Sequence, residues 1–200
     1  MTPLSFGLVR VAMERLGYPF REVGNFNLNL VGIRAATLRN SNQFDDTLAV
    51  LFYQDGRPLM VTLRATTDPG RSYLQNPITE AGTAILKPGH HRGMWSLGLH
   101  RGLYPALIQT GETTVLRDRN ADSYLDTEDV PQERGHFGIN CHRAAESYIP
   151  THVERWSAGC QVVRDSHDFE LLLALCRRAA SAWGNTFDYT LLNEEQLWTR

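Results

Sequence analysis

The chain has 200 residues, of which 42% are hydrophobic, 10% aromatic and 21% charged. This length and composition predict a globular protein of one sizeable domain that folds without disulfide staples. The formal net charge of −2 provides no basic field for phosphates, which excludes nucleic acid as a partner. Three cysteines are an odd number, so at least one thiol is free.

Residues 1–18 do not have the pattern of a secretory signal, because Arg10, Glu14 and Arg15 interrupt the apolar residues. No run in the chain approaches the roughly 18 apolar residues of a membrane span. We therefore expect a soluble protein made in the cytoplasm, without an export signal or a membrane partner. The same residues predict a short amphipathic helix that ends at Gly17 and Pro19. Its apolar face is expected to consist of Leu8, Val11, Ala12 and Leu16.

A β-rich region follows this helix. Residues 25–33 alternate polar and apolar side chains, which is typical of a half-buried strand. Residues 47–53 and 58–64 flank Asp55-Gly56, a pair that readily takes the positive-φ turn of a hairpin. Further short strands are expected at residues 82–86, 104–109, 113–117, 138–142, 159–163 and 187–192.

The clearest helix is predicted at residues 165–183. Asp165 or Ser166 caps its start, and Gly184 follows its end. Its apolar face is expected to carry Leu171, Leu172, Leu175 and Ala179. Together these elements predict an α+β fold dominated by a β-sheet or barrel, with helices at either end of a single domain over residues 1–200.

The segments most informative for chemistry are residues 137–142 and 155–163. A cysteine nucleophile needs a base within hydrogen-bond reach and N–H groups that hold the developing oxyanion. Gly159 lets the backbone turn before Cys160, and the N–H groups of both residues can then face a substrate carbonyl. His142 is the natural partner to lower the thiol pKa. A buried core thiol also explains Cys160, and from these residues alone we favour that interpretation.

These segments resemble the catalytic signature of the L,D-transpeptidases, cysteine enzymes that cross-link or trim peptidoglycan stem peptides. The family pattern is a histidine, a spacer of about 14 to 17 residues, and then Ser/Thr-His-Gly-Cys. Here His142 is followed after 14 residues by Ser157-Ala158-Gly159-Cys160. Residues 66–70 and 82–86 resemble other parts of the family more loosely. The resemblance covers roughly residues 45–192 as a core that includes the helix after the cysteine strand, and it leaves residues 1–44 as an N-terminal extension of helix and strand.

The resemblance implies a set of catalytic residues and two departures from the family. The implied set is Cys160 as nucleophile, His142 as base, Ser157 as the group that orients the imidazole, and the N–H groups of Gly159 and Cys160 as oxyanion donors. The second-motif histidine of the family is Ala158 here, and its substrate-orienting arginine is Val162. With the resemblance included, we favour catalysis by Cys160 over a core thiol.

The implied activity is cofactor-free acyl transfer on peptidoglycan stem peptides, as hydrolysis more than cross-linking. Substrate contacts are expected from Arg155, Arg143, Trp156 and Trp95. Because no export signal is found, we expect the protein to reach the wall after phage lysis or by effector delivery, and the chain also resembles small phage and prophage proteins. The alternative is a non-catalytic cell-wall-binding or virion-associated protein on a degenerate transpeptidase-like fold, and a general intracellular cysteine protease or amidase is a third hypothesis.

Two further segments suggest metal binding. Asp118, Asn120, Asp122 and Asp126 place oxygen atoms at alternate positions, as in the first half of a calcium loop. Ser123 stands at the position of the loop glycine and Asp129 at that of the bidentate glutamate, so we favour an Asx-rich turn between strands over a metal site.

The second segment contains His90, His91 and His100, which lie among glycines without a cysteine or carboxylate at zinc spacing. We expect an exposed loop there, in preference to a cleft-side loop that contacts a ligand. His136 is a weaker candidate for the base, and Cys141 and Cys176 are expected in the core.

Overall fold

The computed structural model describes residues 3–36 and 42–198. Eight strands form a closed barrel: β1 (Asn29–Arg34), β2 (Asp46–Gln54), β3 (Arg57–Thr66), β5 (Gly89–His100), β6 (Tyr104–Gln109), β9 (Cys141–Arg143), β10 (Gln161–Val163) and β11 (Phe187–Asn193). Their order around the barrel is β1-β11-β5-β6-β9-β10-β3-β2. Three more strands form a small sheet in the order β4-β7-β8: β4 (Thr83–Leu86), β7 (Thr113–Asp118) and β8 (Gln132–Gly135).

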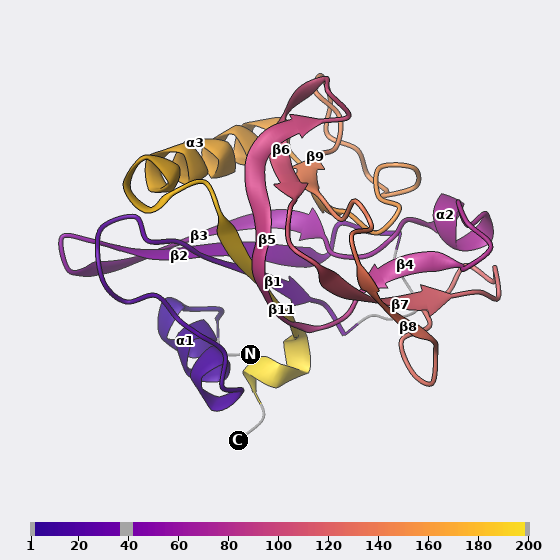
Figure 1. The fold of residues 1–200 in the computed structure, drawn as a ribbon, viewed down its shortest axis with the longest axis horizontal. Coiled ribbons are helices and arrows are strands. Elements are labelled where there is room, and N and C mark those ends of the chain that lie inside the picture. The colour runs from indigo at the N-terminus through magenta and orange to yellow at the C-terminus, as the bar shows by residue number, and fades with distance from the viewer. Residues whose placement is uncertain (1–2, 37–41, 199–200) are drawn as a thin grey trace.

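The described helices are α1 (Phe6–Arg15), α2 (Arg71–Gln75), α3 (Ser166–Trp183) and the 3-10 helix η1 (Glu194–Leu197). Helix α3 and the small sheet lie on opposite sides of the barrel (Figure 1). The predicted β-rich α+β fold is therefore confirmed. Among the described residues, no helix combines the length and the apolar character that crossing a membrane requires.

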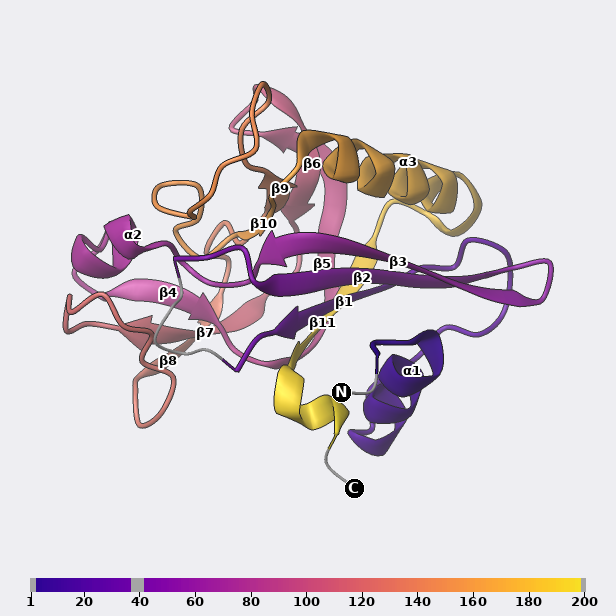
Figure 2. The same cartoon turned by 180° about the vertical axis from the view of Figure 1, so that it is seen from behind.

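The hairpin of β2 and β3 forms as predicted, and its two strands run side by side over their full length (Figure 2). Asp55 and Gly56 both have positive φ, at 51° and 74°. These angles match the two-residue hairpin turn whose twist suits the flanking strands. Short-range turn chemistry is enough to determine this element.

Strand β1 is buried on both faces, so the predicted half-buried alternation is wrong. Leu30 belongs to the cluster inside the barrel, whereas Val31 packs with Val9 of α1 on the outer side. β1 also pairs with both β2 and β11, so the segment that we assigned to an N-terminal extension closes the barrel. Helix α1 forms as predicted but is rotated, because Val9, Ala12 and Met13 are buried and Val11 is exposed.

Helix α3 begins and ends where the sequence predicts. The Asp165 side chain accepts the His167 N–H, and Gly184, with a φ of 91°, ends the helix. The buried face differs from the predicted one, because Leu171 is 45% exposed. The side chains that pack on the barrel core are Phe169, Leu172, Leu173, Cys176 and Ala179.

Strand β5 occupies the segment for which we predicted an exposed loop. It pairs with β11 on one side and with β6 on the other. Its glycines suggested a loop, but Gly98 lies inside the ladder opposite Ala106, and Gly93 takes a φ of 58° where the pairing with β11 shifts register. The prediction failed because glycine also occurs in strands at bulges and at close approaches.

Strands β9 and β10 are shorter than predicted and are parallel, with His142 opposite Val162. Gly138 and Gly159 have φ values of 72° and 122°, which end the extended conformation on the N-terminal side of each strand. The two predicted catalytic segments therefore meet in the barrel wall, with the Gln161 N–H bonded to the Asn140 carbonyl at 2.9 Å.

Candidate active site

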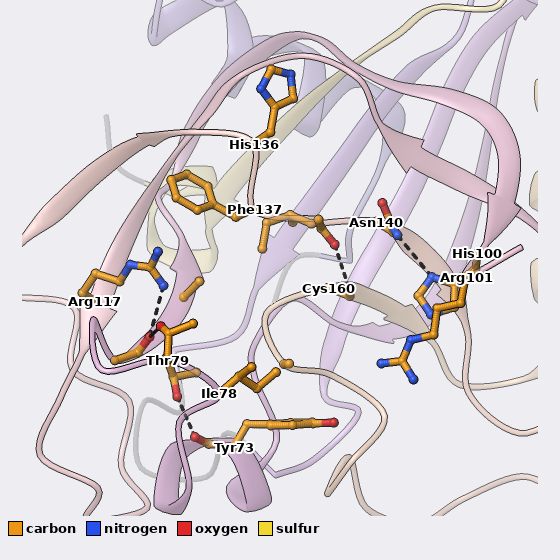
Figure 3. A pocket seen from close by; sticks show the side chains of 16 residues that line it. Tyr73, Ile78, Thr79, His100, Arg101, Arg117, His136, Phe137, Asn140 and Cys160 are labelled. Atoms are coloured by element: carbon orange, nitrogen blue, oxygen red, sulfur yellow. Dashed lines mark hydrogen bonds between the residues drawn. The ribbon is translucent and has the colours of Figure 1, made fainter.

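A cavity of about 420 Å³ lies where the barrel meets the small sheet (Figure 3). Thr83 and Arg117 line it from the small sheet, and Tyr73 lines it from α2. Cys160 and His100 line it from the barrel side. A pocket of this volume suits a small peptide or a comparable ligand.

Cys160 is partly exposed and precedes β10, whereas Cys141 and Cys176 are buried as expected. Its thiol donates to the Gly138 carbonyl at 3.4 Å (Figure 3). A side chain at Gly159 would collide with the Ala84 carbonyl, so only glycine fits before the cysteine. The local backbone therefore presents Sγ at the cavity wall.

Burial raises the pKa of Cys160 to about 11, although the Asn140 N–H and the charge of Arg101 act in the opposite direction. The expectation that a histidine partner lowers this pKa is therefore wrong for the resting protein. The physical reason is that desolvation disfavours the thiolate more than these two groups favour it. At neutral pH the thiol is protonated.

His142 is buried in β9, beside β10. Its Nδ1 lies 2.7 Å from the Arg143 carbonyl oxygen, which can only accept, so Nδ1 carries the proton. The lone pair of this neutral imidazole is therefore on Nε2. Burial lowers the pKa of His142 to about 4, so at neutral pH it is an uncharged base.

His100, at the end of β5, stacks on His142 with ring centroids 4.2 Å apart. The Gln109 N–H donates to Asn140 Oδ1 at 2.8 Å, which sets the orientation of that amide. Asn140 Nδ2 then donates to His100 Nδ1 at 3.2 Å (Figure 3). The proton of neutral His100 is therefore on Nε2, and burial lowers the pKa of this residue. His100 is a site residue that the sequence analysis placed in an exposed loop.

We expected Ser157 to orient the imidazole of His142, but its hydroxyl has other hydrogen-bond partners. Its hydroxyl donates to the Cys160 carbonyl at 2.8 Å and accepts the Gly159 N–H at 3.1 Å. The group that orients His142 is the Arg143 carbonyl instead. Because its N–H is bonded to Ser157, Gly159 also does not serve as an oxyanion donor in this conformation, and Ser157 shapes the turn before Cys160.

The four predicted substrate-binding residues do not line the cavity. Trp95 is fully buried, and its Nε1 donates to the Ile139 carbonyl at 2.8 Å, so that prediction is wrong. Trp156 packs against a cluster that includes Val162. The Arg143 guanidinium lies 4.3 Å from the centre of the Tyr104 ring, and Arg155 is exposed elsewhere on the surface.

The positive charges at the cavity come from Arg101 and Arg117. Arg117 pairs with Glu133 at 2.7 Å, whereas Arg101 makes no ion pair within the described part of the chain. Arg101 occupies the tight turn after β5 with a φ of 51°. In the sequence, Arg101 could be recognised only as an arginine beside Gly102 between two strand-forming segments. That position indicates a turn only once β5 is known to be a strand.

His90 and His91 do not form a metal pair. His90 Nδ1 lies 2.9 Å from Thr190 Oγ1, and His91 Nδ1 lies 2.6 Å from Thr113 Oγ1. His136 lines the cavity, and its Nε2 lies 3.1 Å from the Thr110 carbonyl oxygen.

Comparison of the chain with protein-family models, with curated proteins and with solved structures finds no match. The function is therefore inferred from the chemistry of the cavity.

Proposed function

We propose that this protein is a cysteine acyl-transfer enzyme that hydrolyses peptidoglycan stem peptides, in the manner of the L,D-transpeptidases that its His142…Cys160 pattern resembles. One observation carries the proposal. Cys160 is partly exposed at the wall of a cavity that it shares with His100, and His100 stacks on His142. The stacking therefore puts the proposed base, which does not itself line the cavity, next to a residue that shares the cavity with the nucleophile.

The tautomers support different roles for the two imidazoles. His142 Nε2 accepts the Cys160 proton while Sγ forms a bond to the substrate carbonyl carbon. The Cys160 N–H and the His100 Nε2–H are the donors for the oxyanion. The C–N bond then breaks as the amine takes the proton from His142. Water, deprotonated by His142, attacks the thioester, releases the acid and restores the thiol.

The resting pKa values support a concerted start to the reaction. The pKa of Cys160 is about 11 and that of His142 is about 4, so transfer of the thiol proton to the imidazole before attack is strongly unfavourable. Proton transfer therefore accompanies formation of the C–S bond.

A substrate carboxylate near Arg101 fits this scheme, because the arginine binds the substrate without a covalent role.

The charges at the cavity suit a stem peptide as the acyl donor. Stem peptides carry free carboxylates, and Arg101 and Arg117 are the cations that line the cavity.

Digestion of purified sacculi, with products assigned by mass, tests the proposal. We expect wild type to release cleaved muropeptides and Cys160→Ala to release none. Cys176→Ala is the matched control, because the same exchange at a buried thiol of α3 leaves the cavity unchanged. Full activity of Cys160→Ala would refute the proposal. Binding to sacculi by both wild type and Cys160→Ala, without any product, would establish the non-catalytic alternative instead.

A further inference from the structure

Asn140 lies immediately before β9, lines the cavity and is fixed by hydrogen bonds at both its side chain and its backbone. Its Oδ1 accepts the Gln109 N–H at 2.8 Å, and its Nδ2 donates to His100 Nδ1 at 3.2 Å (Figure 3). The Asn140 N–H donates to the Gly138 carbonyl, and the Asn140 carbonyl accepts the Gln161 N–H, both at 2.9 Å. A reversed amide would place its NH₂ group against the Gln109 N–H, so only one orientation of the side chain is satisfied.

Gln109, the last residue of β6, holds the same part of the cavity wall. Its Oε1 accepts the N–H groups of Phe137 and Ile139 at 3.0 and 2.8 Å. Its Nε2 donates to the carbonyls of Gly111 and Gly135 at 2.9 and 3.1 Å. Both acceptor sites and both hydrogens of this amide are therefore used on backbone groups. The N–H that orients the asparagine comes from a residue that is itself anchored on several sides.

The asparagine amide determines what His100 can offer to a ligand. Because the amide nitrogen can only donate, His100 Nδ1 is an acceptor and the ring proton is on Nε2. A second proton on Nδ1 would face the amide hydrogens, and burial and Arg101 also lower the pKa of His100. The other ionisable side chains against the ring are His142 and Tyr104, with ring centroids 4.2 and 5.4 Å away. Neither carries a negative charge at neutral pH that would stabilise an imidazolium.

We propose that Asn140, held by Gln109, is a positioning residue that keeps His100 in its Nε2–H form as a hydrogen-bond donor to an oxygen atom of the bound substrate. The inference rests on the proposed function, in which His100 contributes a donor for the oxyanion, and it names the residue that determines this contribution. A donor at this place selects a carbonyl or carboxylate oxygen, whereas an amino group would leave two donors facing each other.

Nitrogen-15 NMR of the full-length protein with labelled histidine shows which ring nitrogen carries the proton. The His100 signals are assigned by their loss in His100→Gln. At neutral pH we expect wild type to have the proton on Nε2 and none on Nδ1. Asn140→Asp keeps the acceptor for the Gln109 N–H but replaces the donor to His100 by a second acceptor. In that variant Nδ1 should become protonated, and the pKa of His100 should rise beside the introduced carboxylate.

Asn185→Asp is the matched control. The Asn185 amide also bonds to β5, through the Leu97 N–H and carbonyl, but Asn185 does not line the cavity. The same exchange there should leave the His100 signals and kcat as in wild type.

The pH dependence of kcat distinguishes positioning from a general structural defect. In Asn140→Asp, protonated His100 still has a hydrogen on Nε2, whereas neutral His100 should have its hydrogen on Nδ1. Relative to wild type, kcat for muropeptide release should therefore fall by about 10² to 10³ as the pH rises through the titration of His100 that NMR locates. A structural defect would lower kcat by the same factor at every pH.

The wild-type spectrum alone can overturn the inference, by showing the proton on Nδ1 of His100, even if the variant does not fold. Unchanged His100 signals in Asn140→Asp would also overturn it, as would a kcat that is unchanged or reduced equally at every pH. If wild type releases no muropeptide, the proposed function fails, and the NMR spectra still decide whether Asn140 determines the tautomer of His100.

Discussion

The rings of His100 and His142 stack at 4.2 Å between centroids and 30° between planes, and His100 lines the same cavity as Cys160. Their hydrogen bonds give them opposite tautomers. His142 has its proton on Nδ1 and a lone pair on Nε2, whereas His100 has its proton on Nε2. One imidazole is therefore arranged as a base and the other as a hydrogen-bond donor.

This difference predicts distinct results for the two histidines. His142→Ala should lower kcat for muropeptide release by about 10² to 10⁴, the usual contribution of a general base. His100→Ala should lower kcat by about 10² to 10³, as for the loss of an oxyanion donor, and His100→Gln should restore part of it because its amide can donate. In wild type, kcat/KM should fall below about pH 4, where His142 becomes protonated. Equal activity of His142→Ala and wild type would contradict these roles.

The cavity predicts that Arg101 binds the substrate and that Arg155 does not. Arg101→Gln should raise KM about tenfold, with a smaller effect on kcat, because an arginine–carboxylate contact made equally in the ground and transition states is lost. Arg155→Gln should leave both constants within about twofold of wild type, since Arg155 is exposed and does not line the cavity. Steady-state kinetics on purified muropeptides measure both variants. A larger effect at Arg155 would show that the substrate lies along the other surface.

His91 predicts acid-sensitive stability. Burial lowers its pKa from 6.5 to about 4, so in this interval the unfolded chain is protonated there and the folded chain is not. Because the unfolded state then binds more protons, the free energy of unfolding should fall as the pH falls from about 6.5 to about 4, by roughly 3 kcal/mol for this group.

The comparison with His91→Gln isolates this effect. Asp46 acts in the opposite direction, because burial raises its pKa to about 7, and the lowered pKa of His142 acts in the same direction as that of His91, so the total pH dependence mixes several groups. Urea unfolding of wild type and His91→Gln across this pH range gives the difference between them. That difference should shrink as the pH falls, and a constant difference would mean that His91 does not titrate in this way.

Two neighbouring leucines of α3 test which face of that helix is buried. Leu172 is fully buried in the barrel core, whereas Leu171 is 45% exposed. Leu172→Ala should lower the free energy of unfolding by about 2 to 5 kcal/mol, through lost burial and the cavity that remains. Leu171→Ala should change it by less than about 0.5 kcal/mol, as for most surface substitutions. Thermal and urea unfolding measure both, and comparable losses would contradict the observed packing.

Features that depend on neighbouring residues could be predicted from the amino-acid sequence alone. Asp55-Gly56 specifies its hairpin because positive φ at both positions favours one turn type. Asp165 and Gly184 delimit α3 because each meets the backbone needs of a helix end locally. Cys160 stood out in the same way, through its spacing from His142 and the glycine before it.

The residues that surround that cysteine, and the faces that are buried, depend on long-range packing that the sequence pattern does not reveal. His100 joins His142 across 41 intervening residues because β5 is a strand, and glycine-rich spacing alone does not distinguish that strand from a loop. Trp95 is in the core and Arg101 is at the cavity because of barrel closure, which pairs segments far apart in the chain. The high pKa of Cys160 has the same origin, since desolvation depends on what packs around the thiol and not on its sequence neighbours.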